Sequence, residues 1–213
     1  MKSASKAGSG AGVTFFALKA AGKVAVDPGF RFDPIARAEP TAQFFAMTSD
    51  EWFAQTPVRP MFEVIYIDGL HTQEQTLRDL LNATERLVPD GVIIIDDVIP
   101  SNPEAALPDQ AACYEIRDQQ GNPSRAWMGD VFRLLYFIET FMQSWTFEVV
   151  SENHGQAVLW RAPRAQIPER PLDSVARKSY DDLVADMARQ RQPLASISER
   201  YAAQREILMA RLP

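Results

Sequence analysis

The chain is poor in cysteine and histidine and has no long apolar run. Cys113 is the only cysteine among 213 residues, so no internal disulfide can form. No stretch of 18 consecutive apolar residues and no signal-peptide pattern occurs, and the sequence therefore predicts neither a membrane span nor export. These absences favour a cytoplasmic protein.

Basic residues are also too few for a phosphate-binding surface. Lys and Arg total 22 against 28 Asp and Glu, which gives a net charge of -6. This balance argues against nucleic acid or anionic lipid as a partner and leaves a small molecule as the expected one. A hydrophobic content of 46% and a charged content of 23% are typical of a soluble globular protein. The length suits one domain with an appendage.

Strand and helix patterns alternate along the first half of the chain. Residues 13–21 have a helical pattern, and KVAVD (23–27) has that of a short buried strand. Another strand is predicted over 43–47. A helix over SDEWFAQ follows, with Ser49 as its expected N-cap.

The segment from 62 to 95 has the clearest pattern. FEVIYID (62–68) is an apolar strand, and Thr72 with Gln75 has the form of a capping box that opens a helix. Pro89-Asp90-Gly91 is expected to end that helix before VIII (92–95) forms the next strand. This order predicts two parallel strands joined by a crossover helix.

The remaining core elements complete an α/β pattern. Residues 100–124 are predicted to form a long polar loop, long enough to act as a lid. A helix over 129–142 and an antiparallel strand pair at 145–150 and 155–161 follow. The predicted fold class is α/β, with a mostly parallel sheet, an antiparallel edge and helices on both faces.

A domain boundary is expected near 163–170. Pro163, Pro168 and Pro171 indicate an extended connector between a domain over 1–162 and a helical C-terminal extension over 163–213. In the extension, Ser196 and Glu199 have the spacing of a capping box. Its helices either pack back on the domain or form a homodimer contact.

Acidic residues end three of the predicted strands. They are Asp27, Asp68 and the pair Asp96-Asp97. Each alone could cap a helix or lie in solvent. Because the carboxyl ends of parallel strands meet at one sheet edge, we expect Asp68 and Asp96 to lie close together, where a Mg²⁺ ion would relieve their repulsion.

Two further groups lie at the same predicted edge. His71 follows Asp68 by three residues and could act as a general base, bind a metal, or bond only to the backbone. The glycines Gly8, Gly10 and Gly12 precede a helix and a strand that ends in Asp27, an arrangement that suits an adenosine cofactor.

A tryptophan and an acid precede the helix predicted over 129–142. Trp127 could cover the core or close over a ligand, and Asp130 could cap the helix or face a substrate. No Gly-Lys-Ser/Thr ending, no Gly-x-Ser-x-Gly elbow and no zinc-ligand spacing occurs, which disfavours phosphate-loop enzymes, α/β-hydrolases and zinc proteins.

The segment YIDGLHTQEQTLRDLLNATERLVPDGVIIIDDVIP, with VAVDP before it and WMGDVFRLL after it, resembles the class I S-adenosylmethionine-dependent methyltransferases. The resemblance extends over about residues 8–161 and is closest to small bacterial members with Asp-Gly-x-His and Asp-Asp motifs. It implies a Rossmann-like methyltransferase fold with S-adenosylmethionine as cofactor. The cofactor positions it implies are Gly8, Gly10 and Gly12 beside the methionine, Asp27 on the ribose hydroxyls, Ser49 and Asp50 beside the adenine, and Asp68.

Metal-dependent members of the same class add a second implication. Catechol and macrolide-sugar O-methyltransferases hold Mg²⁺ with an acid after strand four and an acidic pair after strand five, positions that Asp68, Asp96 and Asp97 match. The resemblance implies O-methylation of a small hydroxylated substrate such as a sugar or secondary metabolite. His71 and Asp68 would be catalytic, and Trp127 and Asp130 would contact substrate. Related enzymes work without metal, so both possibilities stay open.

The N-terminus departs from that class. Only MKSASKA precedes Gly8, where relatives have an apolar first strand, so this strand is expected to be missing or degenerate unless another segment fills its place. The departure favours an alternative function, a catalytically impaired methyltransferase-fold protein that acts as a binding module. A nicotinamide-dependent oxidoreductase is disfavoured because the length leaves no room for a substrate domain.

Overall fold

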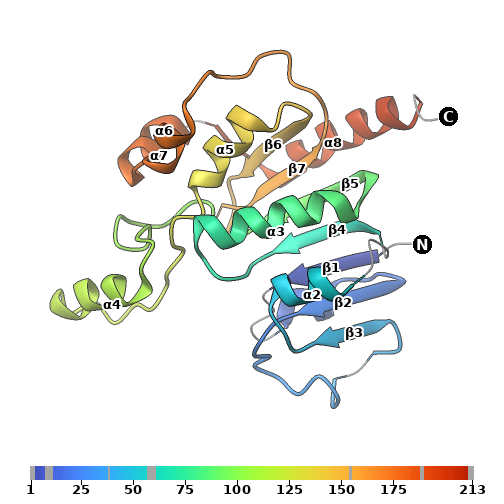
Figure 1. Cartoon of the computed structure of the whole chain (residues 1–213), viewed down its shortest axis with the longest axis horizontal. Helices are drawn as coiled ribbons and strands as arrows, with labels where there is room; N and C mark the ends of the chain where they lie inside the picture. Colours follow the sequence, from blue (N-terminus) through green and yellow to red (C-terminus); the bar gives the residue numbers. More distant parts are fainter. Residues whose placement is uncertain are drawn as a thin grey trace. The chain divides into compact units, whose positions relative to one another are not determined.

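A computed structural model describes residues 3–7, 12–37, 39–56, 61–153, 155–187 and 190–210, and for 3–7 and 187 it describes the backbone alone. The chain divides into two compact units (Figure 1). The first contains Met1–Leu70 and Gln75–Ile94, and the second contains His71–Glu74 and Ile95–Pro213. Each unit is described by itself below.

The first unit is built on five strands. They are β1 (Ser3–Ala7), β2 (Gly22–Val26), β3 (Ala42–Phe45), β4 (Phe62–Ile67) and β5 (Leu87–Ile95), in the order β3-β2-β1-β4-β5. β1 pairs in parallel with both β2 and β4, and β2 pairs in parallel with β3. The predicted parallel sheet is confirmed.

The first strand, expected to be missing or degenerate, is present, although its sequence SASKA lacks large apolar residues. Ser3–Ala7 forms β1 and occupies the place between β2 and β4. Parallel pairing uses the backbone N–H and C=O groups that every residue except proline carries, so an apolar sequence is not required. The central position of β1 supplies these groups with partners on both sides.

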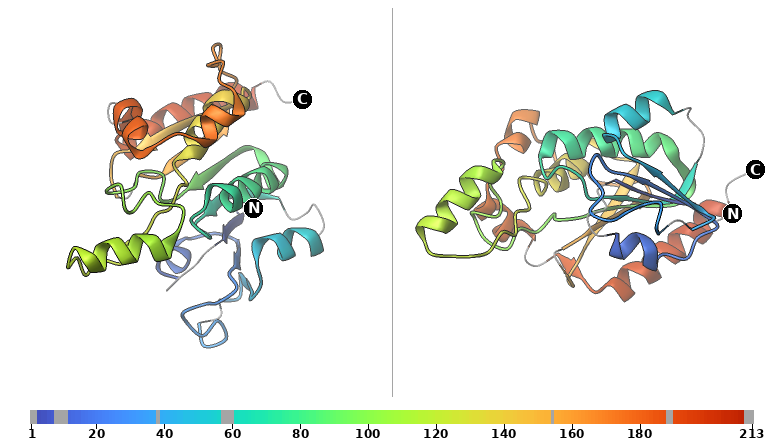
Figure 2. Two further views of the ribbon diagram at one scale, coloured as in Figure 1. Left: turned by 60° about the vertical axis from the view of Figure 1, so that its left-hand side comes forward. Right: turned by 90° about the horizontal axis from the view of Figure 1, so that it is seen from below.

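Helices cover both faces of this sheet. In the right-hand view of Figure 2, α1 (Val13–Ala17) lies on one face, and α2 (Ser49–Gln55) and α3 (Gln73–Arg86) lie on the other. On α3, Leu80 and Ala83 are buried while Leu81 is 48% exposed, as expected of an amphipathic helix. The Arg86 guanidinium joins α3 to the end of α2 by donating to the carbonyl of Thr56 at 2.8 Å.

Two predicted helix boundaries are wrong. The N-cap of α2 is Thr48 rather than Ser49, because Thr48 and Glu51 form the reciprocal bonds of a capping box. Pro89-Asp90-Gly91 does not end α3 but lies inside β5, which begins directly after Arg86. A Cβ atom at Gly91 would lie 2.9 Å from the Glu63 carbonyl oxygen of β4, so only glycine fits at this point of the strand.

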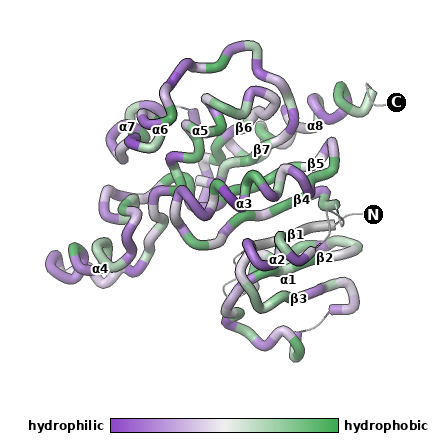
Figure 3. The backbone as a smooth tube through the Cα atoms, viewed as in Figure 1, coloured by the Kyte–Doolittle hydropathy of each residue, from purple (hydrophilic) through white to green (hydrophobic). Residues whose placement is uncertain are grey.

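Several strands of the first unit are mainly hydrophobic. In Figure 3, β4 and β5 are coloured mainly as hydrophobic. The core of the first unit includes Val24, Val26, Ile65 and Ile67 from adjacent strands. Among the described residues, no helix combines the length and apolar character needed to cross a membrane.

The second unit contains the antiparallel pair that the sequence predicts. β6 (Trp145–Val150) and β7 (Ala157–Arg161) are antiparallel, and the two-residue strand β8 (Arg191–Gln192) pairs in parallel with the end of β6. The helix predicted over 129–142 is the shorter α5 (Arg133–Phe141), which contacts β6.

The predicted long loop over 100–124 contains a helix. α4 (Gln110–Gln119) begins at the N-cap Asp109, whose carboxylate accepts hydrogen bonds from the amides of Ala111 and Ala112. The lid hypothesis therefore does not apply to the whole segment. An aspartate before a run of helix-forming residues was the available signal.

The C-terminal extension is helical, as predicted. It contains α6 (Leu172–Ala176), α7 (Tyr180–Met187) and α8 (Leu194–Met209); α6 contacts α5, and α8 contacts β6. The capping box predicted at Ser196 is wrong, since α8 already begins at Leu194. Residues 163–213 belong to the same compact unit as 95–162, and the predicted boundary and homodimer contact stay predictions.

Candidate functional site

Two of the predicted acids flank the carboxyl end of β1 in the first unit. Ala7, the last residue of β1, is paired with Val26 of β2 and with Ile67 of β4. Asp27 and Asp68 are the next residues along these two strands, so both leave the sheet at the same level. With one strand between them, their backbones are separated by about 10 Å. The first unit therefore brings Asp27 and Asp68 to opposite sides of one strand end.

Asp27 is half-buried and fixed by a turn. Its Oδ1 atom accepts a hydrogen bond from the amide of Gly29 at 2.7 Å, which closes the Pro28-Gly29 turn predicted from the sequence. The carboxylate is thus held in one orientation at the end of β2. A fixed carboxylate in this place suits hydrogen bonds from the two hydroxyls of a ribose.

Gly12 occupies a position that only glycine tolerates easily. Its φ is 74°, and a Cβ atom there would lie 2.7 Å from the ring of Phe16 and 2.8 Å from that of Phe32. These rings belong to an aromatic cluster with Phe15, Phe30 and Phe44. Gly8 and Gly10 lie outside the described residues, so their predicted contact with a cofactor is not tested.

Ser49 and Asp50 begin α2 and are joined to α3. The side-chain amide of Gln75 donates to Ser49 Oγ and to Asp50 Oδ1, both at 3.2 Å. Arg78 forms an ion pair with Asp50 at 3.3 Å between Nη2 and Oδ2. The two residues predicted beside the adenine therefore share one polar network within the first unit.

The sequence analysis missed Asp79, the buried member of this network. Asp79 is 2% exposed, and its Oδ1 accepts a hydrogen bond from Gln75 at 3.1 Å. Burial raises the pKa of its carboxyl above the ordinary value, while hydrogen bonds from Ser49 and Gln75 act in the opposite direction. An acid among the apolar-face positions Leu80 and Ala83 of a helix was the signal that could have found it.

In the second unit, His71 lies between an acid and a carbonyl. Its Nε2 is 3.3 Å from Oδ2 of Asp97, and its Nδ1 is 2.8 Å from the backbone oxygen of Trp127. The imidazole is 24% and the Asp97 carboxylate 15% exposed, so both remain accessible to a small ligand. The structure brings together His71, Asp97 and Trp127.

The hydrogen bond to Trp127 decides the tautomer of His71. A carbonyl oxygen can only accept, so Nδ1 carries a hydrogen, while Nε2 donates to the Asp97 carboxylate when the ring is protonated. An imidazole nitrogen and a carboxylate oxygen are both metal-ligand atoms, so these residues also fit a metal ion.

The segment Trp127-Met128-Gly129-Asp130 holds the His71 loop in place. The Trp127 ring stacks on the imidazole with 5.5 Å between ring centroids, and its Nε1 donates to the Leu107 carbonyl at 2.7 Å. Gly129, with a φ of 63°, lies against the His71 backbone. The Trp127 ring, the Trp127 carbonyl and the Gly129 backbone therefore all contact His71.

Asp130, expected to cap the following helix or to face a substrate, lies against the start of α3, and its contact with a substrate stays a prediction. Asp130 is 6% exposed, its Oδ1 accepts from the backbone amide of Gln73 at 2.7 Å, and its Oδ2 pairs with Arg133 at 2.6 Å. It satisfies the first turn of α3 rather than that of α5. Because the partner lies 57 residues away, sequence spacing could not reveal it.

The Asp96-Asp97 pair directs its two side chains differently. Asp97 has a φ of 58°, and its amide donates to Oδ1 of Asp96 at 3.1 Å. A left-handed conformation costs an aspartate roughly 1–2 kcal/mol. It also points the Asp97 side chain in a different direction from that of Asp96. Asp97 reaches His71, whereas Asp96 supports the turn. The predicted convergence of Asp68 with this pair joins the two units and stays a prediction.

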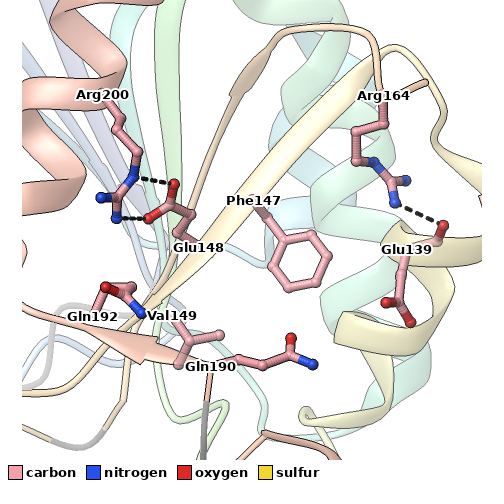
Figure 4. A pocket seen from close by; sticks show the side chains of 8 residues that line it. All are labelled: Glu139, Phe147, Glu148, Val149, Arg164, Gln190, Gln192 and Arg200. Atoms are coloured by element: carbon pink, nitrogen blue, oxygen red, sulfur yellow. Dashed lines mark hydrogen bonds and ion pairs between the residues drawn. The ribbon is translucent and has the colours of Figure 1, made fainter. Parts of the chain in front are cut away.

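A cavity in the second unit is separate from these groups. It has a volume of about 560 Å³, and Figure 4 shows Phe147 projecting into it from β6. The Glu148–Arg200 ion pair borders one side, and Arg164, which donates to the Glu139 backbone oxygen, borders the other. None of its lining residues is a predicted site residue.

Comparison with known proteins finds a family profile that matches part of the chain. Residues 6–98 match the sequence profile of a family described as a methyltransferase domain. No curated protein sequence matches the chain.

Several solved structures have a similar fold. One is an O-methyltransferase from Bacillus cereus in complex with SAH, with a TM-score of 0.53 and 14% identity over 76% of this chain and 74% of that one. A protein from Staphylococcus aureus assigned as a caffeoyl-CoA O-methyltransferase has a TM-score of 0.52 and 12% identity, over 76% of each chain. A third, from Klebsiella pneumoniae and assigned as an O-methyltransferase, has a TM-score of 0.50 and 15% identity over 75% of this chain and 73% of that one.

The fold is that of the class I methyltransferases. The resemblance found in the sequence motifs is therefore confirmed. The part of this methyltransferase fold that the profile matches begins within β1 and ends just beyond Asp97. It includes Asp27, Asp68 and His71 but not Trp127, which supports His71 from outside the matched segment.

Proposed function

We propose that the chain is an S-adenosylmethionine-dependent methyltransferase that acts on a hydroxyl group of a small molecule such as a sugar or a secondary metabolite. The observation that carries the proposal is the register that sets Asp27 and Asp68 on either side of the end of β1. In open α/β sheets, ligands bind outside the carboxyl ends of the strands. The matched methyltransferase profile and the SAH-bound relative support the same cofactor.

Residues of the first unit would hold the cofactor. Asp27 accepts hydrogen bonds from the ribose hydroxyls, and Ser49 and Asp50 lie beside the adenine. Gly8, Gly10 and Gly12 line the methionine end, where a glycine backbone allows close approach. Bound S-adenosylmethionine supplies an electrophilic methyl group.

Acidic residues and His71 would act on the acceptor. Asp68 and the Asp96-Asp97 pair contribute carboxylates for a divalent cation, with Mg²⁺ as the ion that the family resemblance suggests. Such a cation would lower the pKa of a hydroxyl bound to it. His71 either removes the hydroxyl proton or binds the cation, and Trp127 borders the acceptor beside it. Orientation of the acceptor toward the methyl group supplies much of the rate enhancement.

The presence of β1 supports a catalytic function over a non-catalytic binding module. The departure that favoured the module was a first strand expected to be missing or degenerate, and Ser3–Ala7 forms a strand in this place. The sheet that supports a cofactor site is therefore complete at its centre.

Calorimetric titration of the full chain with S-adenosylhomocysteine tests the cofactor. We expect micromolar binding that Asp27→Ala weakens at least tenfold, since about 1.4 kcal/mol of hydrogen bonding is a factor of ten. Asp33→Ala is the matched control, because Asp33 also accepts backbone amides in the loop after β2. Absence of binding by the folded wild-type chain, or equal losses in both variants, would contradict the proposal.

A further inference from the structure

We propose that Arg117 is a positioning residue for His71. Its buried guanidinium holds the backbone around Trp127, and this places the Trp127 carbonyl against Nδ1 of the imidazole. All three residues belong to the second unit. The inference rests on the proposed function only for the part that His71 plays in the reaction, and it assigns no chemistry to Arg117 itself.

The Arg117 guanidinium is buried on α4 and binds uncharged oxygens. Arg117 lies in the last turn of the helix and is 1% exposed. Its Nη1 donates to the Ala126 carbonyl and, at 3.4 Å, to that of Ser124. Its Nη2 lies 3.4 Å from Oδ1 of Asn102. Because a buried charge is costly unless it is hydrogen-bonded, the guanidinium and these three oxygens depend on one another.

The turn after α4 brings residues 124–126 back beside the helix. Gly121 has a φ of 67°, and the amide of Asn122 donates to the Arg117 carbonyl at 2.8 Å. A left-handed glycine just beyond a helix is a common way to reverse the chain. Tyr114, on the same helix, donates to the carbonyl of the middle residue of the segment at 3.1 Å. Side chains of α4 therefore hold all three carbonyls of 124–126.

The segment after Trp127 is connected to the same guanidinium. The two amides that follow Trp127 donate to the Ala105 carbonyl at 3.1 and 2.9 Å. The Ala105 amide in turn donates to Oδ1 of Asn102 at 2.8 Å, which is the oxygen that Arg117 approaches. Since Ala126 directly precedes Trp127 and is bound by Nη1, Arg117 acts on the backbone on both sides of Trp127.

The position of the Trp127 carbonyl decides where His71 carries a hydrogen. This carbonyl accepts from Nδ1 at 2.8 Å, so a backbone shift of about 1 Å would break the hydrogen bond. The other ring nitrogen lies 3.3 Å from Oδ2 of Asp97. Without the carbonyl, a neutral ring would carry its single hydrogen on Nε2 and donate it to Asp97. Arg117 therefore keeps a hydrogen on Nδ1 and the ring in one orientation.

Exchange of the Nδ1 hydrogen of His71 with solvent tests the inference. It is measured by nuclear magnetic resonance on the full chain with ¹⁵N-labelled histidine, and His154→Asn assigns the signals, since the chain has only two histidines. We expect Arg117→Met to speed this exchange by about tenfold or more, because the Trp127 carbonyl is no longer held in place. Unchanged exchange in a folded Arg117→Met variant would overturn the inference, whereas a purely structural role predicts no change in the folded population.

Arg125→Met is the matched control. Arg125 belongs to the segment 124–126, but its side chain is 51% exposed and pairs with the exposed Asp118. An exposed ion pair contributes little to stability, so we expect the exchange at His71 to change by less than about threefold. Equal effects of Arg125→Met and Arg117→Met would show that any loosening of α4 moves His71, and this would overturn the specific role of Arg117.

Arg117→Lys covers the case in which Arg117→Met does not fold, because it keeps the buried charge. A single ammonium group cannot present the planar fork that binds oxygens on both sides of Trp127, so we expect exchange at His71 to be about threefold faster or more. Exchange as slow as in the wild type would overturn the inference.

Titration with S-adenosylhomocysteine reports separately on the proposed function. Asp27, Ser49 and Asp50 lie in the first unit, so we expect Arg117→Met to bind within about threefold of the wild-type affinity. Loss of binding in Arg117→Met alone would show a general disruption and overturn the inference. Absence of binding by the wild type would contradict the proposed function, while the exchange measurement would still decide the role of Arg117.

Discussion

Gly129 passes so close to His71 that a Cβ atom at Gly129 would lie 1.6 Å from the His71 carbonyl oxygen. No side chain can occupy this space unless one of the two backbones moves. Since His71 is a candidate site residue, this contact links the packing of the 127–130 segment to the candidate site.

Gly129→Ala should destabilise the protein by more than the strain of its φ of 63°, which is about 1–3 kcal/mol. Gly121→Ala is the matched control, because Gly121 has a φ of 67° with nothing within 4 Å of its Cβ position. Thermal denaturation of both variants measures the difference. Equal losses would show that the contact with His71 costs nothing.

Asp130→Ala should lower the free energy of unfolding by about 2–3 kcal/mol, because it leaves the Gln73 amide and the Arg133 guanidinium without their buried partner. Urea denaturation measures the loss. Asp173→Ala, which breaks the exposed pair with Arg177, should cost less than about 1 kcal/mol. A loss below this control would mean that Asp130 does not stabilise the start of α3.

Asp79 should make the stability of the protein fall with rising pH. Burial raises the pKa of Asp79 in the folded state above its ordinary value of 3.8, so the folded state holds the proton more tightly than the unfolded state. The resulting stabilisation is complete below pH 3.8 and is lost as the pH rises through the folded-state pKa. Asp79→Asn should remove this dependence.

Unfolding free energies of the wild type and of Asp79→Asn, measured as a function of pH, check this sign. The variant should gain stability relative to the wild type as the pH increases above 3.8. Parallel curves for the two proteins would contradict a raised pKa.

Arg164 should be one of the most sensitive positions of the second unit. Its guanidinium donates to the carbonyl of Glu139 at 2.9 Å (Figure 4). It also donates to the carbonyl of Ile138 at 2.7 Å, near the end of α5, and to that of Trp145 at 2.8 Å, at the start of β6. Arg164→Met should cost about 2–4 kcal/mol because these carbonyls lose a charged donor.

Arg164→Lys should restore little of this loss, since an ammonium group cannot present the planar fork of a guanidinium. Chemical denaturation of the two variants beside Arg177→Met, an exposed arginine, provides the comparison. Full rescue by lysine would mean that charge alone matters at this position.

Strand patterns and turn residues were enough to predict much of the fold. The apolar runs of β4 and β5 and the antiparallel pair β6–β7 were readable because each depends on residues close in sequence. Asp27, Asp68 and Asp97 were found in the same way, as acids that follow apolar strands. β1 escaped prediction because its pairing depends on neighbouring backbones rather than on its own side chains.

The sequence by itself therefore determined the fold class and the acids, glycines and histidine that a methyltransferase site could use. Only the tertiary structure decided how three of these residues act. Trp127 fixes the tautomer of His71 across 56 residues, Asp130 bonds to Gln73 across 57, and Asp97 rather than Asp96 reaches His71. A hydrogen bond between distant residues leaves no periodic trace in the sequence, because its geometry depends on the packing of every element between them.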